Sequence, residues 1–355
     1  MLIHRLILKA RARRWRRAPG ACVPTVCVGN VSVGGTGKTP HTELILDLLQ
    51  RSDFWGNCQL GMLSRGYKRK SRGYQVVERG SSASFSGDEP LQIKRKFPAV
   101  TVAVDKKRVR GASNMAKDGV QLIVLDDAFQ YNRLHASLNI VLVDYSRPVF
   151  QDRLLPFGKL RDLPKRIFDA DIIIVSKCPA GMDAAEKAMY AGKLRLKDYD
   201  ASACTARTPG TKKKPGKEIK LLFSHVEYCH PEAVFEGADA RYCYAQKVVP
   251  VTGIANDTPF KAWLSDTYKL NPGLSFPDHH KYGLADISAI LSSARHYRTS
   301  LLATTEKDSV RLHDCKDVPE EVRTRMFYFP IKAVFESEEE LQCLGAALDA
   351  LRTAE

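Results

Sequence analysis

The sequence lacks several features that would assign it to a specialised class of protein. No apolar run approaches the roughly 20 residues that a membrane-spanning helix needs, which excludes a multispan membrane protein. The 23 glycines and 18 prolines show no collagen-like period and no low-complexity bias. The 9 cysteines are odd in number and include no Cys-x-x-Cys pair, which argues against a disulfide framework or a zinc site and favours reduced thiols.

Acidic residues are scarce relative to basic ones. The 355-residue chain has 40 Asp and Glu against 55 Lys and Arg, a formal net charge of +15. Its hydrophobic content of 44% and charged content of 27% are ordinary for a folded chain, so global disorder is excluded. The positive charge predicts attraction to a polyanion, which leaves nucleic acid, an anionic membrane surface and a phosphorylated substrate open.

The first 18 residues form a basic, amphipathic arm. Arg5 and Lys9 interrupt the apolar stretch that a secretory signal would need, so export is not expected. Apolar residues four apart share a helical face, which predicts either an interfacial helix on anionic lipid, with Trp15 as an anchor, or a first helix docked on the core. The apolar members are Leu2, Ile3, Leu6, Ile7 and Leu8, and the basic ones include Arg11, Arg13, Arg14, Arg16 and Arg17.

A glycine-rich loop follows the first predicted strand, Thr25–Val28, and precedes a predicted helix from about 38 to 50. The loop consists of Ser32, Val33, Gly34, Gly35, Thr36, Gly37, Lys38 and Thr39. In such a loop the backbone N–H groups bind phosphate oxygens, the lysine reaches the β- and γ-phosphates, and the threonine hydroxyl coordinates Mg²⁺. The strict pattern has glycine where this chain has Ser32. Strand, loop and helix together still predict a nucleotide-phosphate site.

Two aspartates end another predicted strand. Asp126 and Asp127 follow the apolar run Leu122–Leu125, and one carboxylate can hold Mg²⁺ while the other orients it. Together with Thr39 they predict a site for Mg²⁺ and ATP or GTP. The other interpretation is that Asp126 only ends the strand. A hydrolase, a nucleotide-dependent switch and a kinase all use this machinery.

The fold class follows from the strand pattern. The apolar runs at 122–125, 140–143 and 172–175 do not alternate with polar residues, which is typical of strands buried on both faces of a parallel sheet. We expect an α/β protein with a P-loop NTPase-like parallel sheet, helices on both of its faces, and a smaller α/β second domain. The turn-rich, charged stretch predicts a linker at 211–217 between a nucleotide-binding domain at 19–210 and a second domain at 218–355.

Motifs over nearly the whole chain resemble the tetraacyldisaccharide 4'-kinase family of Gram-negative bacteria. The resemblance lies in Gly29–Pro40, Leu63–Tyr67, Gly87–Pro90, Leu125–Gln130, Leu155–Arg161, Gly253–Asn256, Phe276–His280 and Thr304–Asp308. Ser32 belongs to the family's own form of the phosphate loop. The resemblance implies an ATP- and Mg²⁺-dependent kinase of lipid A biosynthesis that phosphorylates the 4'-hydroxyl of tetraacyldisaccharide 1-phosphate. It also implies a peripheral enzyme on the cytoplasmic side of the inner membrane.

The resemblance also implies roles for individual residues. Asp88 becomes the general base for the sugar hydroxyl, with His279 as its partner from the second domain. An aspartate is a weak base, and an imidazole can orient it or raise its basicity. A turn-forming Asp88 and a capping or core His279 stay open as alternatives.

The resemblance assigns roles near the phosphoryl group to two further residues, and the chain differs from the family's usual sequence at one position beside the paired aspartates. Arg161 becomes a stabiliser of transition-state charge and Asp162 an assistant ligand of Mg²⁺, although the family usually has glutamate there. Alternatively, the two are neighbours of opposite charge on a solvated loop. Ala128 stands where the family commonly has glycine, so a positive φ at that position would be strained.

Two other functions compete with the kinase. A GTPase switch or metallochaperone-type protein would share the loop and use Ser176 and Lys177 for guanine. A nucleic-acid-binding ATPase is disfavoured because aromatic residues are not interleaved with the basic clusters. We therefore expect a phosphorylated glycolipid and an anionic membrane surface as partners, no nucleic acid and no obligate protein partner. The basic loop from Arg65 to Arg72 either meets the anomeric phosphate of the acceptor or is a solvated face.

Overall fold

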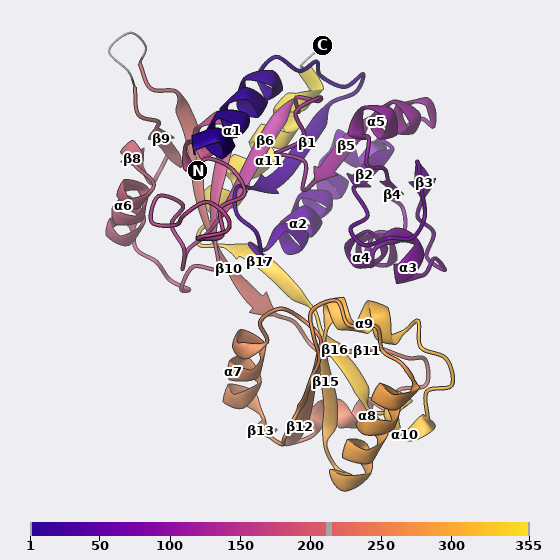
Figure 1. The fold of residues 1–355 in the computed structure, drawn as a ribbon. Coiled ribbons are helices and arrows are strands. Elements are labelled where there is room, and N and C mark those ends of the chain that lie inside the picture. The colour runs from indigo at the N-terminus through magenta and orange to yellow at the C-terminus, as the bar shows by residue number, and fades with distance from the viewer. Residues whose placement is uncertain (1, 211–214, 354–355) are drawn as a thin grey trace.

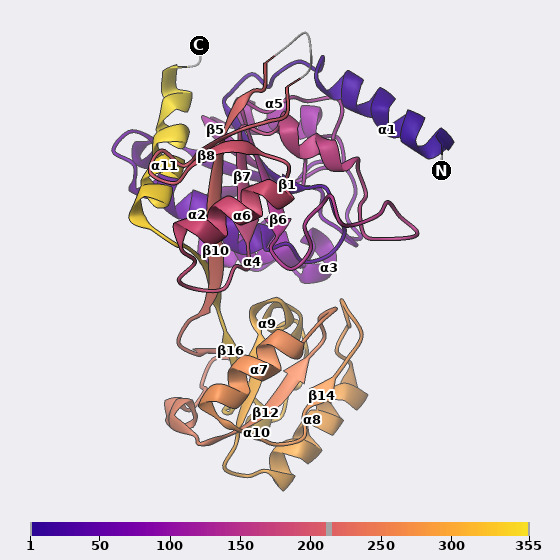
Figure 2. The same ribbon diagram turned by 90° about the vertical axis from the view of Figure 1, so that its left-hand side faces the viewer.

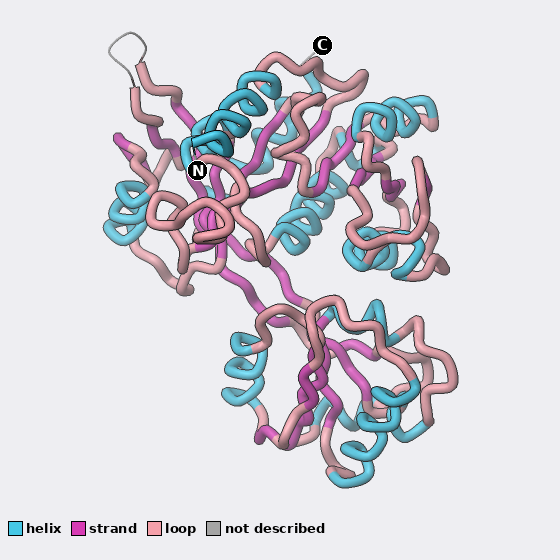
Figure 3. The backbone as a smooth tube through the Cα atoms, in the orientation of Figure 1, coloured by secondary structure: helices cyan, strands magenta, loops and turns pink. Residues whose placement is uncertain are grey.

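The protein folds into two bodies, each built on its own sheet (Figure 1). The structure is a computed structural model that describes residues 2–210 and 215–353. Within these described residues, the larger sheet has 11 strands and the smaller has 6. A two-stranded ribbon connects the bodies (Figure 3).

The larger sheet has a parallel centre. Its strand order is β3-β4-β2-β5-β1-β6-β7-β10-β9-β8, with β17 paired to β10. The strands are β1 (Thr25–Asn30), β2 (Leu60–Ser64), β3 (Gln75–Val76), β4 (Thr101–Val104), β5 (Leu122–Asp126), β6 (Leu138–Asp144), β7 (Ile172–Ser176), β8 (Lys197–Asp200), β9 (Thr205–Arg207), β10 (Glu218–Tyr228) and β17 (Ile331–Phe335). The helices of this body are α1 (Leu2–Trp15), α2 (Lys38–Arg51), α3 (Ala83–Ser86), α4 (Asp88–Lys96), α5 (Arg108–Lys117), α6 (Ala184–Lys193) and α11 (Glu338–Asp349).

Successive residues of the central strands enter two different hydrophobic cores. In β1, Val26 and Val28 pack into one core while Cys27 packs into the other, and in β6 Ile140 and Val141 separate in the same way. A strand buried on both faces has no polar side to alternate with, which explains the continuous apolar runs in the sequence. The predicted α/β class with a parallel sheet and helices on both faces is confirmed.

The smaller body has a second parallel-dominated sheet, with strand order β11-β16-β15-β12-β13 and with β14 paired to β12. Its strands are β11 (Glu232–Ala233), β12 (Lys247–Thr252), β13 (Lys269–Leu270), β14 (Leu274–Ser275), β15 (Leu301–Thr305) and β16 (Met326–Phe329). Its helices are α7 (Thr258–Thr267), α8 (Leu284–His296), α9 (Glu306–Leu312) and α10 (Glu320–Arg323). Two apolar clusters fill the space between this sheet and its helices.

The predicted domain boundary at 211–217 is wrong. Residues 218–228, predicted to open the second domain, form β10, which pairs with β7 in the first sheet. The predicted linker lies between β9 and β10, which are antiparallel neighbours with Arg207 opposite Glu218; residues 211–214 are outside the described part of the chain. Turn-rich, charged sequence marks a connection between two strands as well as one between domains. The second body instead spans about 229–330.

The chain enters and leaves the second body through adjacent strands. In the ribbon, residues 224–228 of β10 pair antiparallel with residues 331–335 of β17. After β17, α11 packs back against the first body, where the Trp55 indole N–H donates to the Leu348 carbonyl oxygen at 3.1 Å. Residues on both sides of the second body in sequence therefore complete the first one.

Helix α1 lies at the edge of the first body, with one of its faces packed against it (Figure 2). Leu8, Ala12 and Trp15 are buried. The Trp15 ring lies 5.3 Å from the ring of Phe129, and the Arg166 guanidinium lies 4.3 Å from the Trp15 ring. Of the two interpretations of the arm, the docked first helix is confirmed for Trp15, whose side chain belongs to the core, and a role for Trp15 as a membrane anchor is wrong.

Truncating Trp15 should destabilise the protein. Trp15→Ala removes a buried indole that packs against the Phe129 ring and the Arg166 guanidinium, and such truncations cost about 3–5 kcal/mol. Urea unfolding followed by circular dichroism should show a clearly lower midpoint. Arg13→Ala, an exposed change on the same helix, is the control and should move the midpoint little. Equal midpoints for Trp15→Ala and wild type would show that α1 is not docked in solution.

Candidate active site

The phosphate loop lies between β1 and α2, at the carboxyl edge of the larger sheet. Gly34 has φ 103° and Gly37 has φ 79°, values that glycine adopts at little cost. The loop is held from two sides: the Asn30 side-chain amide donates to the Thr36 hydroxyl at 2.6 Å, and the Ser176 hydroxyl donates to the Thr36 carbonyl oxygen at 2.9 Å. These contacts tie the loop to the ends of β1 and β7.

Lys38 and Thr39 occupy the first turn of α2, as predicted from the loop pattern. His41, one turn further on, was not singled out by sequence reasoning. Its Nδ1 lies 2.7 Å from the Gly37 carbonyl oxygen and its Nε2 lies 2.9 Å from the Ser224 hydroxyl. Burial lowers the pKa of His41 to about 4, so the ring is neutral and fastens the loop to β10. The only sequence signal for a role of His41 was its position, three residues after Lys38.

Asp126 and Asp127 lie side by side in opposite electrostatic environments. Burial, with the Asp127 charge, raises the pKa of Asp126 to about 6, and this carboxylate accepts from the Ser64 hydroxyl at 3.2 Å. Burial also acts on Asp127, but the hydrogen bond from Arg161 and the Lys38 charge outweigh it and lower the pKa of Asp127 to about 2. The Lys38 ammonium is 3.9 Å from Asp127 Oδ1. Asp127 is thus the permanently charged member of the pair.

The backbone just after β5 takes a positive φ, one residue earlier than the position that the sequence analysis considered. Positive φ occurs at Asp127, with φ 48°, and not at Ala128. Ala128 therefore does not have the strain that a positive φ would have caused there. Aspartate is among the non-glycine residues that tolerate this region best.

Arg161 and Asp162 diverge. Arg161 reaches the site, where its Nη1 donates to Asp127 Oδ2 at 3.0 Å and its Nη2 donates to the Asn30 side-chain oxygen. Asp162 instead lies 3.5 Å from Arg166 Nε, and burial raises its pKa. The structure therefore brings Arg161, Lys38 and Asp127 together, while Asp162 is engaged by a different cation. A metal role for Asp162 stays a prediction.

Asp88 and His279 meet across the two bodies. Asp88 is the first residue of α4, after Gly87 with φ 94°, and His279 lies in the loop before α8. His279 Nδ1 is 3.0 Å from Asp88 Oδ2. Both side chains are largely buried, with exposed fractions of 14% and 12%. Two residues 191 positions apart are thus in hydrogen-bond contact, which is the pairing that the family resemblance implied.

Two cations of α9 surround this pair, and sequence reasoning assigned a role to neither. Arg311 Nε lies 3.5 Å from Asp88 Oδ2, and Lys307 Nζ lies 3.2 Å from His279 Nε2. Burial alone would raise the pKa of Asp88, but the His279 hydrogen bond and the charges of Arg311 and Lys307 lower it. The available signal was the motif Thr304–Asp308, which contains Lys307 and begins seven residues before Arg311.

Some of the other basic side chains near this edge of the sheet have partners within the protein, and others are exposed. Arg69 is turned inward, where its Nη1 donates to the Ser71 hydroxyl at 3.2 Å. Lys177, considered for base recognition, pairs with Asp144 at 3.0 Å. The exposed members of the basic loop are Arg65, Lys68, Lys70 and Arg72.

Sequence comparisons identify the family. The family model for tetraacyldisaccharide-1-P 4'-kinase matches residues 1–349. The tetraacyldisaccharide 4'-kinase of Parabacteroides distasonis is 35% identical over 331 residues, which cover 90% of this chain and 83% of that protein. The chain belongs to the tetraacyldisaccharide 4'-kinase family. The member from Porphyromonas gingivalis is 36% identical over 327 residues, or 89% of this chain and 85% of its own.

A solved structure supports the same family. The crystal structure of LpxK from Aquifex aeolicus in complex with ATP matches with a TM-score of 0.69 and 25% identity, over 98% of this chain and 96% of that one. The predicted family, fold and kinase class are confirmed, and the switch and nucleic-acid alternatives are set aside. None of the helices in residues 2–210 and 215–353 has the length and apolarity required to span a bilayer.

Proposed function

We propose that this member of the tetraacyldisaccharide 4'-kinase family transfers the γ-phosphoryl group of ATP to the 4'-hydroxyl of tetraacyldisaccharide 1-phosphate. The contact between Asp88 and His279 carries the proposal, since it joins a carboxylate and an imidazole from different bodies. Glu89, the neighbour of Asp88, is close enough to Asp126 for its charge to raise the pKa of Asp126. This nearness supports the proposal that the two clusters form one active site.

The phosphate side of the site suits ATP and Mg²⁺. Lys38 supplies the cation for the β- and γ-phosphates, and Thr39, Asp126 and Asp127 supply the oxygen ligands for the metal. No cluster of three or more His, Cys, Asp or Glu side chains that could hold a metal occurs among residues 2–210 and 215–353. A pair of carboxylates and a hydroxyl fits Mg²⁺, which keeps waters and phosphate oxygens in its shell and neutralises developing charge.

The acceptor side of the site suits proton removal from an alcohol. As the 4'-oxygen forms its bond to the γ-phosphorus, the bond to the β–γ bridging oxygen breaks and ADP leaves. Asp88 takes the hydroxyl proton, and His279 holds its carboxylate in place through the hydrogen bond to Oδ2. Arg161, held beside Lys38 by Asp127, adds a second cation for charge on the γ-phosphoryl group.

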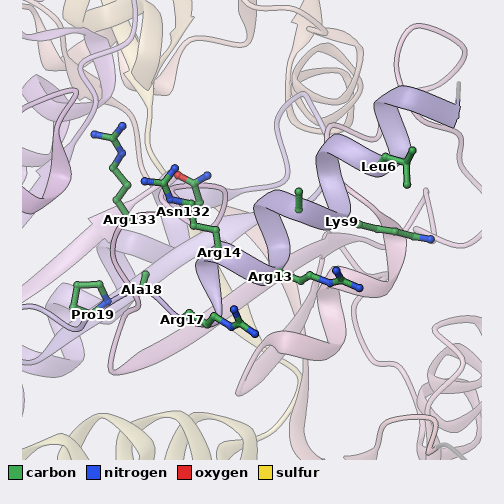
Figure 4. A pocket seen from close by; sticks show the side chains of 10 residues that line it. Leu6, Lys9, Arg13, Arg14, Arg17, Ala18, Pro19, Asn132 and Arg133 are labelled. Atoms are coloured by element: carbon green, nitrogen blue, oxygen red, sulfur yellow. The ribbon is translucent and has the colours of Figure 1, made fainter.

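The arm carries a basic cavity that suits the anionic leaflet in which such an acceptor resides. The cavity measures about 870 Å³ and lies between α1 and the loop at 132–133 (Figure 4). Its cationic lining residues are Lys9, Arg13, Arg14, Arg17 and Arg133. Leu6 and Ile7 are about half exposed on the same helix. We infer peripheral attachment to the cytoplasmic face of the inner membrane through this surface, at roughly 1 kcal/mol for each basic residue near the lipid.

Neutralising the cavity should release the protein from anionic membranes. The triple change of Arg13, Arg14 and Arg17 to glutamine should weaken binding to phosphatidylglycerol vesicles by about 100-fold, because three contributions of about 1 kcal/mol are lost. Vesicle sedimentation measures this. The control replaces three exposed basic residues of the second body, Lys281, Arg298 and Lys316, with glutamine. It therefore has the same net charge as the arm variant. Equal losses for both triple variants would show that total charge governs binding, and not the arm.

Transfer of labelled phosphate tests the proposed reaction directly. The protein is incubated with Mg²⁺, γ-labelled ATP and tetraacyldisaccharide 1-phosphate in detergent micelles, and the lipid phase is counted. We expect label in the lipid that is lost in Asp88→Asn. Steady phosphate release with no labelled lipid would contradict the proposed acceptor.

A further inference from the structure

Lys307 occupies an unusual position beside the Asp88–His279 pair. Its Nζ lies 3.2 Å from His279 Nε2 and 3.1 Å from Glu89 Oε1. An ammonium group has three donors and no acceptor. His279 Nε2 must therefore accept, and the ring proton then resides on Nδ1, where it is donated to Asp88 Oδ2 at 3.0 Å.

A competing acceptor makes this arrangement depend on Lys307. Asp278 Oδ2 lies 3.7 Å from His279 Nε2, within range to attract a proton onto that nitrogen. With the proton on Nε2, the unprotonated Nδ1 would face the Asp88 carboxylate, and two acceptors would repel each other at 3.0 Å. Lys307 Nζ also lies 4.0 Å from Asp278 Oδ1. The ammonium group therefore donates to His279 Nε2 and at the same time attracts the competing carboxylate.

We propose that Lys307 is a positioning residue for phosphoryl transfer, which sets the tautomer of His279 so that the ring donates from Nδ1 to Asp88. The proposal rests on the proposed function of Asp88 as the base. Its consequence is geometric: in residues 2–210 and 215–353 the side-chain contacts of Asp88, from His279 and Arg311, are made through Oδ2. Oδ1 is then presented to the acceptor hydroxyl.

The tautomer can be measured without activity. The ¹⁵N chemical shifts of histidine ring nitrogens report which nitrogen carries the proton, and His279→Gln assigns the His279 signals. We expect a proton on Nδ1 in the wild type and transfer of population to the Nε2-protonated form in Lys307→Met. A wild-type proton on Nε2, or an unchanged tautomer in Lys307→Met, would overturn the proposal.

Kinetics separate positioning from a merely structural role. Lys307→Met should lower kcat by about 10- to 100-fold, the usual range when a group that orients a catalytic side chain is removed, with KM for ATP unchanged. Lys307→Arg should recover most of kcat, because a guanidinium also only donates. Lys281→Met removes an exposed lysine of the same body and should leave kcat intact.

His279→Gln in the same assay separates the role of Lys307 from the role of the Asp88–His279 pair. If His279→Gln retains full kcat, the proposed role of the pair is wrong and the function of the site must be revised. If His279→Gln loses activity while Lys307→Met keeps wild-type kcat and an Nδ1 proton, the pair stands and the role of Lys307 is refuted.

Discussion

Asp88→Asn should lower kcat by about 10²- to 10⁴-fold, the contribution expected of a general base, while the affinity for ATP stays close to that of the wild type. Asparagine matches the shape of aspartate but cannot accept the hydroxyl proton. The side chain contacts His279 and Arg311, on the acceptor side of the site, and makes none of the contacts that hold the phosphate loop. Loss of turnover without loss of nucleotide binding is therefore the expected signature.

Steady-state transfer kinetics and calorimetric titration with a non-hydrolysable ATP analogue measure the two quantities separately. Asp47→Asn changes a partly exposed aspartate of α2 that pairs with the exposed Arg51, serves as the matched control and should behave as the wild type. If ATP affinity collapsed together with kcat in Asp88→Asn, Asp88 would have to be reassigned to the nucleotide or the metal.

Lys38→Ala should abolish measurable turnover, with a loss of at least about 10³-fold. The β- and γ-phosphates lose the cation at the start of α2, and developing charge on the transferred group is no longer neutralised there. Asp127, whose carboxylate lies 3.9 Å from the Lys38 ammonium, keeps the Arg161 hydrogen bond that lowers its pKa, so it should stay ionised and the loss should come from the missing lysine.

The same transfer assay measures this loss, and Mg²⁺ is titrated in the variants that retain turnover. Lys70→Ala removes an exposed lysine from the basic loop and leaves the phosphate loop intact, so ATP affinity and Mg²⁺ dependence should be unchanged. Near-normal kinetics in Lys38→Ala would mean that the glycine-rich loop is not the phosphate site.

Features encoded in short stretches of sequence were predictable. The strand, loop and helix around Gly34 and Lys38 are contiguous, and continuous apolar runs such as 140–143 mark strands whose two faces are both covered. Asp126 and Asp127 followed for the same reason, since they end a strand of that kind. The pairing of Asp88 with His279 came from family resemblance, because no local pattern relates residues 191 positions apart.

Features that depend on non-local packing were not predictable. The boundary at 211–217 failed because the pairing of β10 with β7 depends on strand partners rather than on turn composition. The two interpretations of Trp15 stayed open because amphipathic sequence does not reveal whether lipid or protein covers the apolar face, and here Phe129 does. Lys307 and Arg311 gained roles only from the geometry of α9 against α4.

The ribbon of β10 and β17 determines the order in which this protein can be completed during synthesis. Residues 229–330 form a body with its own apolar clusters, and they leave the ribosome before β17 and α11 do. Phe335, Leu344 and Leu348 belong to the core cluster that also contains Ile45 and Leu49 of α2. Until those residues emerge, the helix that begins with Lys38 has an uncovered apolar face. A nascent chain therefore acquires its nucleotide site only after the acceptor-side body has been made.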